Sequence, residues 1–223
     1  MPLPDDGAGT ARRSGPSFDY PTHLIDVWNV GRERLTLRPI LPQDQGPLRE
    51  MLYRTSIATR RARFHEAVDH FAEETLRAMT RLDSSDVLAL VVTRCSPLRG
   101  ETVIADARYV VDVDRAGADF AILVDDAWQR RGVGTRVVNA MLDAAYGEGL
   151  GHLRGSVLRS NTAMLSLLRK LQFSFAHDPD DARLVSAQGR SCRAARHEHS
   201  EQVPPDLRVD LSRTTTPYQR RST

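Results

Sequence analysis

Residues 129–134, Gln-Arg-Arg-Gly-Val-Gly, have the composition and spacing of a turn that could bind a phosphate group. They follow an apolar run, 120–124, that predicts a strand, and they precede an amphipathic stretch that predicts a helix over about 131–146. Gly132 and Gly134 would let the backbone approach an anion closely, and a helix start leaves N–H groups free to bind it. The three-glycine dinucleotide pattern and the Walker pattern ending in Gly-Lys-Ser/Thr are both absent. The sequence therefore predicts an anion-binding turn of another kind.

The order Gln-x-x-Gly-x-Gly between a strand and a helix resembles the pyrophosphate-binding signature of the GNAT superfamily of N-acetyltransferases, which use acetyl-CoA. Two further segments resemble this superfamily in the expected order. The run Asn161-Thr162-Ala163-Met164, followed by Phe173, is similar to its second cofactor element, and residues 35–44 are similar to its opening strand and first helix. The likeness extends over roughly residues 34 to 187, and three elements in sequence are more specific than one short motif.

The resemblance implies which residues contact acetyl-CoA. The strand would pair its backbone with the pantetheine arm, the turn would hold the pyrophosphate through backbone N–H groups, and Asn161 would contact the cofactor from the second element. Asn161 is also suited to capping the helix that follows it, and the two roles are compatible. No metal is expected. The expected cofactor-binding residues are Ile122, Leu123, Val124, Gln129, Arg130, Arg131, Gly132, Val133, Gly134, Thr135 and Asn161.

Asp119 is the candidate catalytic residue. Acetyl transfer to an amine needs the amine neutral, whereas a lysine is almost wholly protonated at pH 7 because its reference pKa lies about three units higher. Asp119 begins the strand that leads into the turn. Residues 118–129 resemble the Ala-Glu-x-x-x-x-Val-x-Asp-x-Trp/Tyr-Gln run of Pat-type protein lysine acetyltransferases, in which the glutamate is the proposed base. Aspartate in its place moves the carboxylate by roughly 1 Å, which a bridging water could take up.

Two positions depart from the superfamily pattern. Leu168 stands seven residues after Asn161, where many members place a tyrosine general acid, and Gln172 replaces the glycine usually found before Phe173. The Pat-like branch commonly lacks this tyrosine too, so the first departure favours that branch. Direct attack by the amine is expected, because no cysteine or serine lies in a recognisably activated setting.

The acceptor is less constrained by the sequence than the cofactor. The Pat-like run favours a protein lysine, such as one on an acyl-CoA synthetase. A small amine such as a polyamine, an amino sugar or an antibiotic is the alternative. A CoA-binding sensor module with little turnover is a third hypothesis, because of the aspartate at position 119 and the missing tyrosine.

Two groups of charged residues near these motifs have a plainer interpretation. Arg60, Arg61 and Arg63 predict a solvated helix face, with contact to an acidic protein surface as the other possibility. Asp125 and Asp126 predict a solvated turn with charges favourable to a helix start, rather than a metal pair.

The order of elements predicts an α/β (α+β) GNAT fold. Antiparallel strands come first and a strand–helix–strand crossover follows, which indicates a mixed central sheet of about six to seven strands flanked by helices, with an N-terminal hairpin over residues 24–40. Helices are also expected over 42–54 and 69–82. The expected organisation is a flexible segment at 1–21, the acetyltransferase domain at 22–187 and a disordered tail at 188–223.

Composition limits the partners and the cellular location that we expect. The 31 lysines and arginines are interspersed with 29 acidic residues, and no recognised nucleic-acid-binding motif is present, which argues against nucleic-acid binding. No run of about 18 apolar residues and no basic-then-apolar leader pattern occurs, so we expect a cytoplasmic protein without a membrane segment. Oligomer formation is possible.

Overall fold

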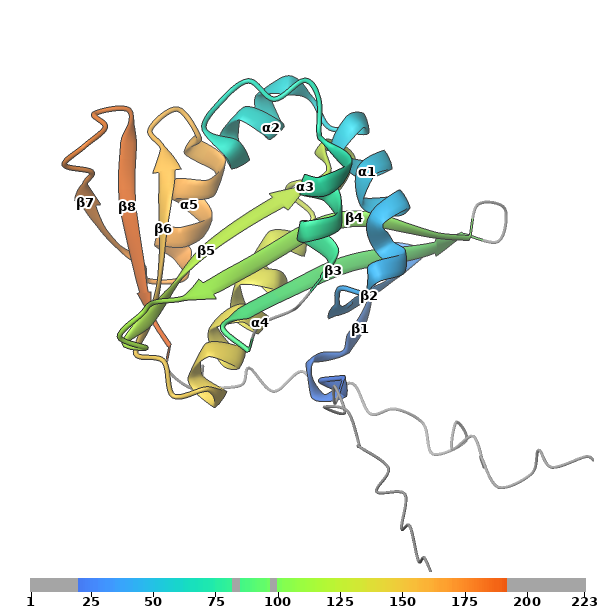
Figure 1. Ribbon diagram of the computed structural model, residues 1–223, viewed down its shortest axis with the longest axis horizontal. Helices are drawn as coiled ribbons and strands as arrows, with labels where there is room; N and C mark the ends of the chain where they lie inside the picture. Colours follow the sequence, from blue (N-terminus) through green and yellow to red (C-terminus); the bar gives the residue numbers. More distant parts are fainter. Residues whose placement is uncertain (1–19, 82–84, 97–99, 192–223) are drawn as a thin grey trace, which may run out of the picture.

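The computed structural model describes residues 20–81, 85–96 and 100–191. In this part of the chain, helices flank both faces of a single sheet (Figure 1). The strands are β1 (Asp26–Val30), β2 (Glu33–Pro39), β3 (Val87–Ser96), β4 (Gly100–Val111), β5 (Gly117–Val124), β6 (His152–Leu158), β7 (Ser174–His177) and β8 (Leu184–Arg190). The helices are α1 (Gln45–Arg54), α2 (Ile57–Phe64), α3 (Glu73–Thr80), α4 (Val133–Gly147) and α5 (Thr162–Lys170), with short 3-10 turns at Thr22–Leu24, Pro42–Asp44 and Asp126–Trp128.

The sheet is mixed, as predicted. Its strand order is β1-β2-β3-β4-β5-β6-β8-β7, and every neighbouring pair is antiparallel except β5 and β6. It has eight strands, against the expected number of about six to seven, because the N-terminal hairpin joins the same sheet when β2 pairs with β3. The one parallel pair, β5 with β6, is joined by the crossover through α4.

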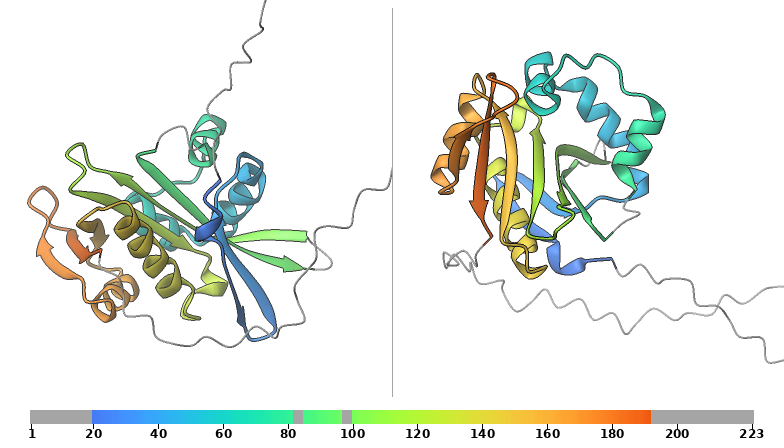
Figure 2. Two further views of the ribbon diagram at one scale, coloured as in Figure 1. Left: turned by 90° about the horizontal axis from the view of Figure 1, so that it is seen from below. Right: turned by 60° about the vertical axis from the view of Figure 1, so that its left-hand side comes forward.

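The parallel pair is short, and the sheet opens where it ends. β5 and β6 pair at only three positions, from Gly117 opposite His152 to Asp119 opposite Arg154. Gly155 follows the last pair, and a Cβ atom on it would lie 2.9 Å from the Phe120 ring and 3.1 Å from the Phe120 carbonyl oxygen. A glycine at this position therefore leaves room for Phe120. The two strands diverge beyond this point (Figure 2).

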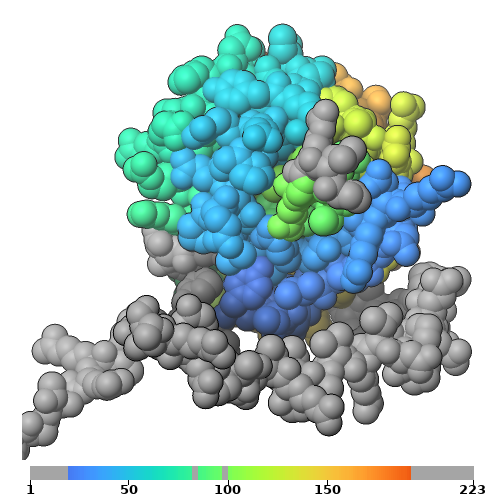
Figure 3. Space-filling view, turned by 90° about the vertical axis from the view of Figure 1, so that its right-hand side faces the viewer, coloured from blue at the N-terminus to red at the C-terminus, as the bar shows by residue number. Residues whose placement is uncertain are grey.

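Two apolar clusters cover opposite faces of the sheet. Phe120 and Ile122 of β5 pack with α4 and α5 in the larger cluster, whereas Leu123 packs with α1 and α3 in the other. Residues alternate between faces along a strand, so these contacts place α4 and α5 on one face and α1 to α3 on the other. Figure 3 shows α1 to α3 beside the β1–β2 hairpin. Among the described residues, no helix combines the length and apolar character needed to cross a membrane.

Several element boundaries differ from the prediction. The helix expected over 69–82 begins at Glu73, because Phe71 packs in the preceding loop against Tyr53, with ring centroids 5.9 Å apart. β8 continues to Arg190, three residues past the expected end of the domain at 187. Tyr20 lies in the expected flexible segment 1–21, yet its hydroxyl donates to the Pro39 carbonyl. The remainder of that segment, 1–19, and most of the tail, 192–223, lie outside the described residues, as does Leu82.

Candidate active site

An open cavity of about 1730 Å³ occupies the divergence between β5 and β6. Residues 120–124 of β5 and 155–158 of β6 form its walls. The turn at 129–135 and the α5 side, 160–170, contribute residues from one face of the sheet, and residues 56–65 around α2 contribute from the other. The cavity therefore passes through the sheet and is reached by both helical layers.

The glycine-containing turn has the backbone that its sequence predicts. Gly132 has a φ of 84° and Arg130 a φ of 57°, so two left-handed residues bend the chain into α4. Gly132 is the N-cap of α4 and no side chain caps the helix, which leaves its first N–H groups without intrahelical acceptors. The helix start therefore offers N–H donors and a positive dipole end to an anion.

Two side chains of the turn point away from the cavity. Val133 is fully buried in the core, and the Arg131 guanidinium lies 5.2 Å from the centroid of the Trp128 ring. Neither residue lines the cavity, so neither side chain contributes to it. Arg130 does line it, and no hydrogen bond or ion pair joins its side chain to another described residue.

The second predicted cofactor element lies on the same side of the cavity. Asn161 lines the cavity and caps α5, its Oδ1 accepting from the Met164 N–H at 3.1 Å. Gly134 of α4 approaches α5 so closely that a Cβ atom on it would lie 2.9 Å from Leu167 Cδ1. Leu168, at the place of the missing tyrosine, is fully buried in the core.

The segment that precedes the turn is hydrogen-bonded to the start of α2. Asp126 accepts from the Ser56 N–H at 2.7 Å, the Ser56 hydroxyl at 2.9 Å and the Thr59 hydroxyl at 2.6 Å. Partial burial raises the pKa of Asp126, but these hydrogen bonds from Thr59 and Ser56 outweigh it and leave the pKa below its ordinary value. Gln129 donates through Nε2 to the Thr59 hydroxyl at 3.1 Å and to the Val124 carbonyl at 3.0 Å. These bonds fix α2 relative to the turn.

The prediction of solvated charges at 60–63 and 125–126 is wrong for two residues. Asp125 is buried, and its carboxylate is satisfied there: Arg54 donates to Oδ2 at 2.6 Å and the Ala127 N–H donates to Oδ1. Arg60 is also buried and donates to backbone carbonyls, including that of Val68 at 2.9 Å. Both side chains bind polar groups that come near them only when the chain folds. A local charge pattern does not reveal such partners.

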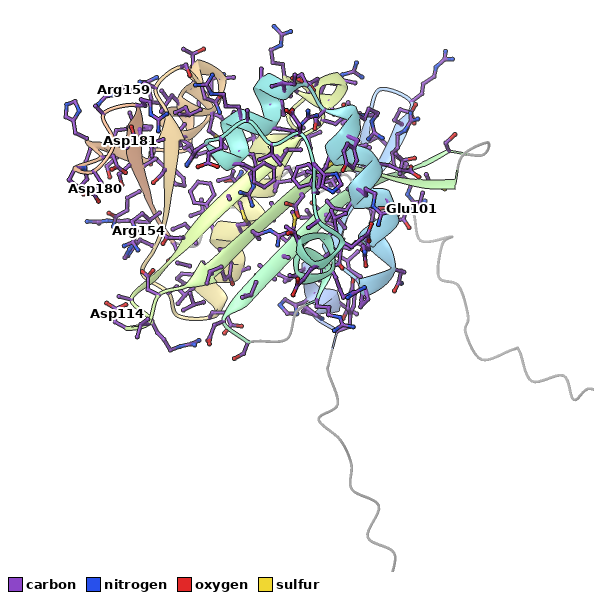
Figure 4. The ribbon with its side chains drawn as sticks, turned by 45° about the horizontal axis from the view of Figure 1, so that its top comes forward. Glu101, Asp114, Arg154, Arg159, Asp180 and Asp181 are labelled. Carbon is purple, nitrogen blue, oxygen red and sulfur yellow. The ribbon has the colours of Figure 1, made fainter. Side chains whose placement is uncertain are left out.

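Asp119 lies at the rim of the cavity rather than in its wall. Its side chain is 62% exposed and its Oδ1 accepts from Arg154 Nε at 2.9 Å. Arg154 projects from β6 (Figure 4) and also binds Asp112 at 2.9 Å, and hydrogen bonding to Asp119 raises the pKa of the Arg154 guanidinium. Phe120 and Ala121, the next two residues of β5, do line the cavity, and the Cα atom of Ala121, on the same face as Asp119, is about 7 Å further along the strand.

The structure brings most of the predicted site residues together. Those that line the cavity are Ile122, Leu123, Val124, Gln129, Arg130, Gly132, Gly134, Thr135 and Asn161. Asp119, Arg131 and Val133 do not line it. The sequence interpretation missed the contribution of α2, from which Thr59, Arg63 and His65 reach the cavity. Ser56 was an available signal, because serine is favoured at helix N-caps, and here its side chain accepts from the Thr59 N–H.

A mixed sheet that opens between two parallel strands, with a glycine turn at the opening, is the architecture expected of a GNAT N-acetyltransferase. The family model for the acetyltransferase (GNAT) domain matches residues 34–174, so the chain belongs to the GNAT acetyltransferase family and is an acyltransferase.

Individual relatives agree with this family. The acetyltransferase PA5475 of Pseudomonas aeruginosa is 26% identical over 165 residues, which cover 73% of this chain and 87% of the relative. The acetyltransferase Pat of Mycolicibacterium smegmatis is 30% identical over 144 residues, which cover 60% of this chain but 40% of that protein. This chain therefore corresponds to less than half of Pat.

Solved structures show the same fold. The GNAT domain of S. lividans PAT superposes with a TM-score of 0.69 at 21% identity, covering 77% of this chain and 99% of that one. A cAMP-binding acyltransferase from Mycobacterium smegmatis has a TM-score of 0.51 at 27% identity, covering 77% of this chain and 49% of that one.

Proposed function

We propose that the chain is an acetyl-CoA-dependent N-acetyltransferase whose acceptor is a protein lysine, with Asp119 as the base. The observation that carries the proposal is the cavity through the sheet, which has an anion-binding helix start on one face and a separate approach past α2 on the other. A cofactor and an acceptor could enter from opposite faces and meet between β5 and β6. The local likeness of residues 118–129 to Pat-type enzymes favours the lysine acceptor.

The residues on the α4 side fit acetyl-CoA. Pairing of β5 with β6 stops at Asp119, so the edge of Ile122, Leu123 and Val124 that faces β6 has no strand partner there. That edge would pair with the amides of the pantetheine arm, as one strand pairs with another. The N–H groups from Arg131 to Thr135 would bind the pyrophosphate, and Asn161 would contact the cofactor across the cavity.

The chemistry proposed for this chain is direct attack of the neutral amine on the thioester carbonyl. A carbon–nitrogen bond forms, the carbon–sulfur bond breaks, and the thiolate leaves with the electron pair. Asp119 would accept the proton of the amine through a bridging water, since its carboxylate stands back from the cavity wall. Among the described residues that line the cavity there is no cysteine, and no serine hydroxyl is hydrogen-bonded to a histidine.

Substitution of Asp119 tests the proposal directly. Release of CoA from acetyl-CoA is measured with lysine peptides, an acyl-CoA synthetase and small amines as acceptors. Asp119→Asn should lower kcat/KM about 100-fold or more near neutral pH, because it removes proton acceptance while keeping the side-chain shape. Acetyl-CoA affinity, measured by calorimetry, should be unchanged.

Asp112→Asn is the matched control, because it removes the other carboxylate that binds Arg154 and leaves Asp119 in place. It should alter kcat/KM by no more than a few-fold. Full activity of Asp119→Asn would remove Asp119 as the base. Tight binding of acetyl-CoA with no turnover on any acceptor would contradict the transferase proposal and support the sensor module, and turnover on small amines alone would replace the lysine acceptor.

A further inference from the structure

The charges that line the cavity are unbalanced. Among the described residues that line it, Arg61, Arg63, Arg130 and Lys170 carry positive charge at neutral pH, whereas Asp126 is the one acidic residue. Both oxygens of Asp126 are taken by Ser56 and Thr59 at the start of α2. None of the four cations has a hydrogen bond or an ion pair with another described side chain. The cavity is therefore suited to ligands that bring their own negative charge.

The four cations divide between the two faces of the sheet. Arg130 belongs to the glycine-containing turn and Lys170 ends α5, so both lie on the α4–α5 side, where the phosphates of the proposed cofactor account for them. Arg61 and Arg63 belong to α2, which reaches the cavity from the opposite face. The phosphate-binding side leaves these two arginines without a counter-charge.

Hydrogen bonds at both ends hold α2 across the opening. Its start is bonded to Asp126 and Gln129, in the segment after β5. At its other end, Nε2 of His65 lies 3.0 Å from the carbonyl oxygen of Ser156 on β6. The helix thus spans from the end of one diverging strand to the other, and it carries Arg61 and Arg63 on the face of the sheet opposite α4 and α5.

Arg63 is the more buried of the two arginines and is incompletely satisfied. Its Nε is inaccessible to solvent and has no hydrogen-bond partner, while its guanidinium lies 4.9 Å from the Phe64 ring centroid. The nearby buried carboxylate of Asp106 is already paired with Arg108 at 2.7 Å. Burial lowers the pKa of Arg63, as expected for a cation without a close partner. A ligand carboxylate cannot reach that Nε, so it would bind the Nη groups of Arg63, which have no hydrogen bond to another described residue.

We infer that Arg61 and Arg63 bind an acidic side chain next to the acceptor lysine, so that the enzyme prefers lysines flanked by aspartate or glutamate. This inference rests on the proposed function and adds the chemistry of the acceptor sequence. Cationic acceptors such as polyamines meet the same two arginines and are disfavoured.

A pair of peptides tests the preference. The two peptides are identical except that the single lysine has glutamate on both sides in one and glutamine in the other. With wild type, the KM of the glutamate peptide should be roughly 10-fold or more lower, which is the scale of a charge-assisted hydrogen bond, with kcat within a few-fold. In Arg63→Gln the ratio of KM values should fall to about 2 or less. The preference should also weaken with salt.

Further variants keep the test decisive. Arg61→Gln alters an exposed residue of α2 and should also reduce the preference without affecting the fold. Arg32→Gln, in the exposed turn between β1 and β2, is the control and should leave the ratio unchanged. Equal KM values for the two peptides in wild type, an unchanged ratio in both α2 variants, or better turnover of spermine than of the glutamate peptide would overturn the inference alone. Failure to acetylate either peptide, with acetyl-CoA binding retained, would overturn the lysine acceptor itself.

Discussion

Gln172 occupies a backbone conformation that favours glycine. Its φ is 62°, and it follows α5 in a Schellman-type ending: the Phe173 N–H donates to the Leu168 carbonyl and the Gln172 N–H to the Arg169 carbonyl. Gln172→Gly should raise the free energy of unfolding by about 1 kcal/mol, because a left-handed conformation costs a residue with a Cβ atom about that much. Urea denaturation with a fixed slope measures the change.

Gln188→Gly provides the matched comparison. Gln188 is exposed in the middle of β8, where the backbone is extended and glycine gains nothing. This variant should lower the free energy of unfolding by about 0.5–1 kcal/mol. Equal destabilisation by both substitutions would show that the Gln172 conformation carries no strain.

Residues that act through the local backbone were predictable from the sequence, and residues that act through distant partners were not. The turn at 129–134 needs only its own glycines and the following helix, so the pattern indicated its place correctly. Asp119 binds Arg154, 35 positions along the chain, and only the register of β5 against β6 brings the two together. The same holds for the burial of Arg60, which donates to the carbonyl of Leu52 in α1 and to that of Val68 in the loop after α2.

At the scale of elements, the start of α2 is held partly by the carboxylate of Asp126, and protonation of that carboxylate should weaken its hold. The pKa of Asp126 is lowered in the folded chain, so the unfolded chain binds the proton more readily. The resulting stabilisation is present above the ordinary aspartate pKa of 3.8 and is lost as the pH falls below it through the lowered value. Thermal unfolding between pH 6 and pH 2.5 should therefore show a smaller loss of stability on acidification for Asp126→Asn than for wild type.

Asp114→Asn serves as the control for that measurement. Asp114 is exposed in the turn between β4 and β5, away from α2 (Figure 4). Its replacement should leave the pH dependence close to that of wild type. If Asp126→Asn retained the full wild-type loss on acidification, the hydrogen bonds from Ser56 and Thr59 would not be the source of that loss.

The elements themselves were largely predictable, because alternation and helical spacing are properties of short windows. The hairpin, the parallel crossover and the helix after the turn all occur near their expected ranges. The start of α3 was predicted too early because Phe71 buries its side chain from a loop, against Tyr53 and Phe64, and not from a helix face. The role of α2 over the cavity depends on how β5 and β6 diverge, and a short stretch of sequence holds no information on that long-range arrangement.

At the scale of the whole molecule, the cavity lies between two separately packed faces, so a ligand that fills it should stabilise both together. CoA at about 100 times its dissociation constant should raise the Tm by about 5–10 °C for a chain of this size. Pantetheine, which lacks the phosphates, should produce a much smaller shift at the same concentration. Differential scanning fluorimetry measures both, and equal shifts would contradict a phosphate-binding role for the start of α4.

The three-position pairing between β5 and β6 also determines how deep the cavity reaches. Each further pair that opened would extend the divergence by about 3.3 Å along the strands, and each pair that formed would shorten it by the same amount. The last pair, Asp119 opposite Arg154, is the point from which this depth is measured. Because Asp119 belongs to this last pair, the register of β5 against β6 also fixes where its carboxylate stands relative to the start of the cavity.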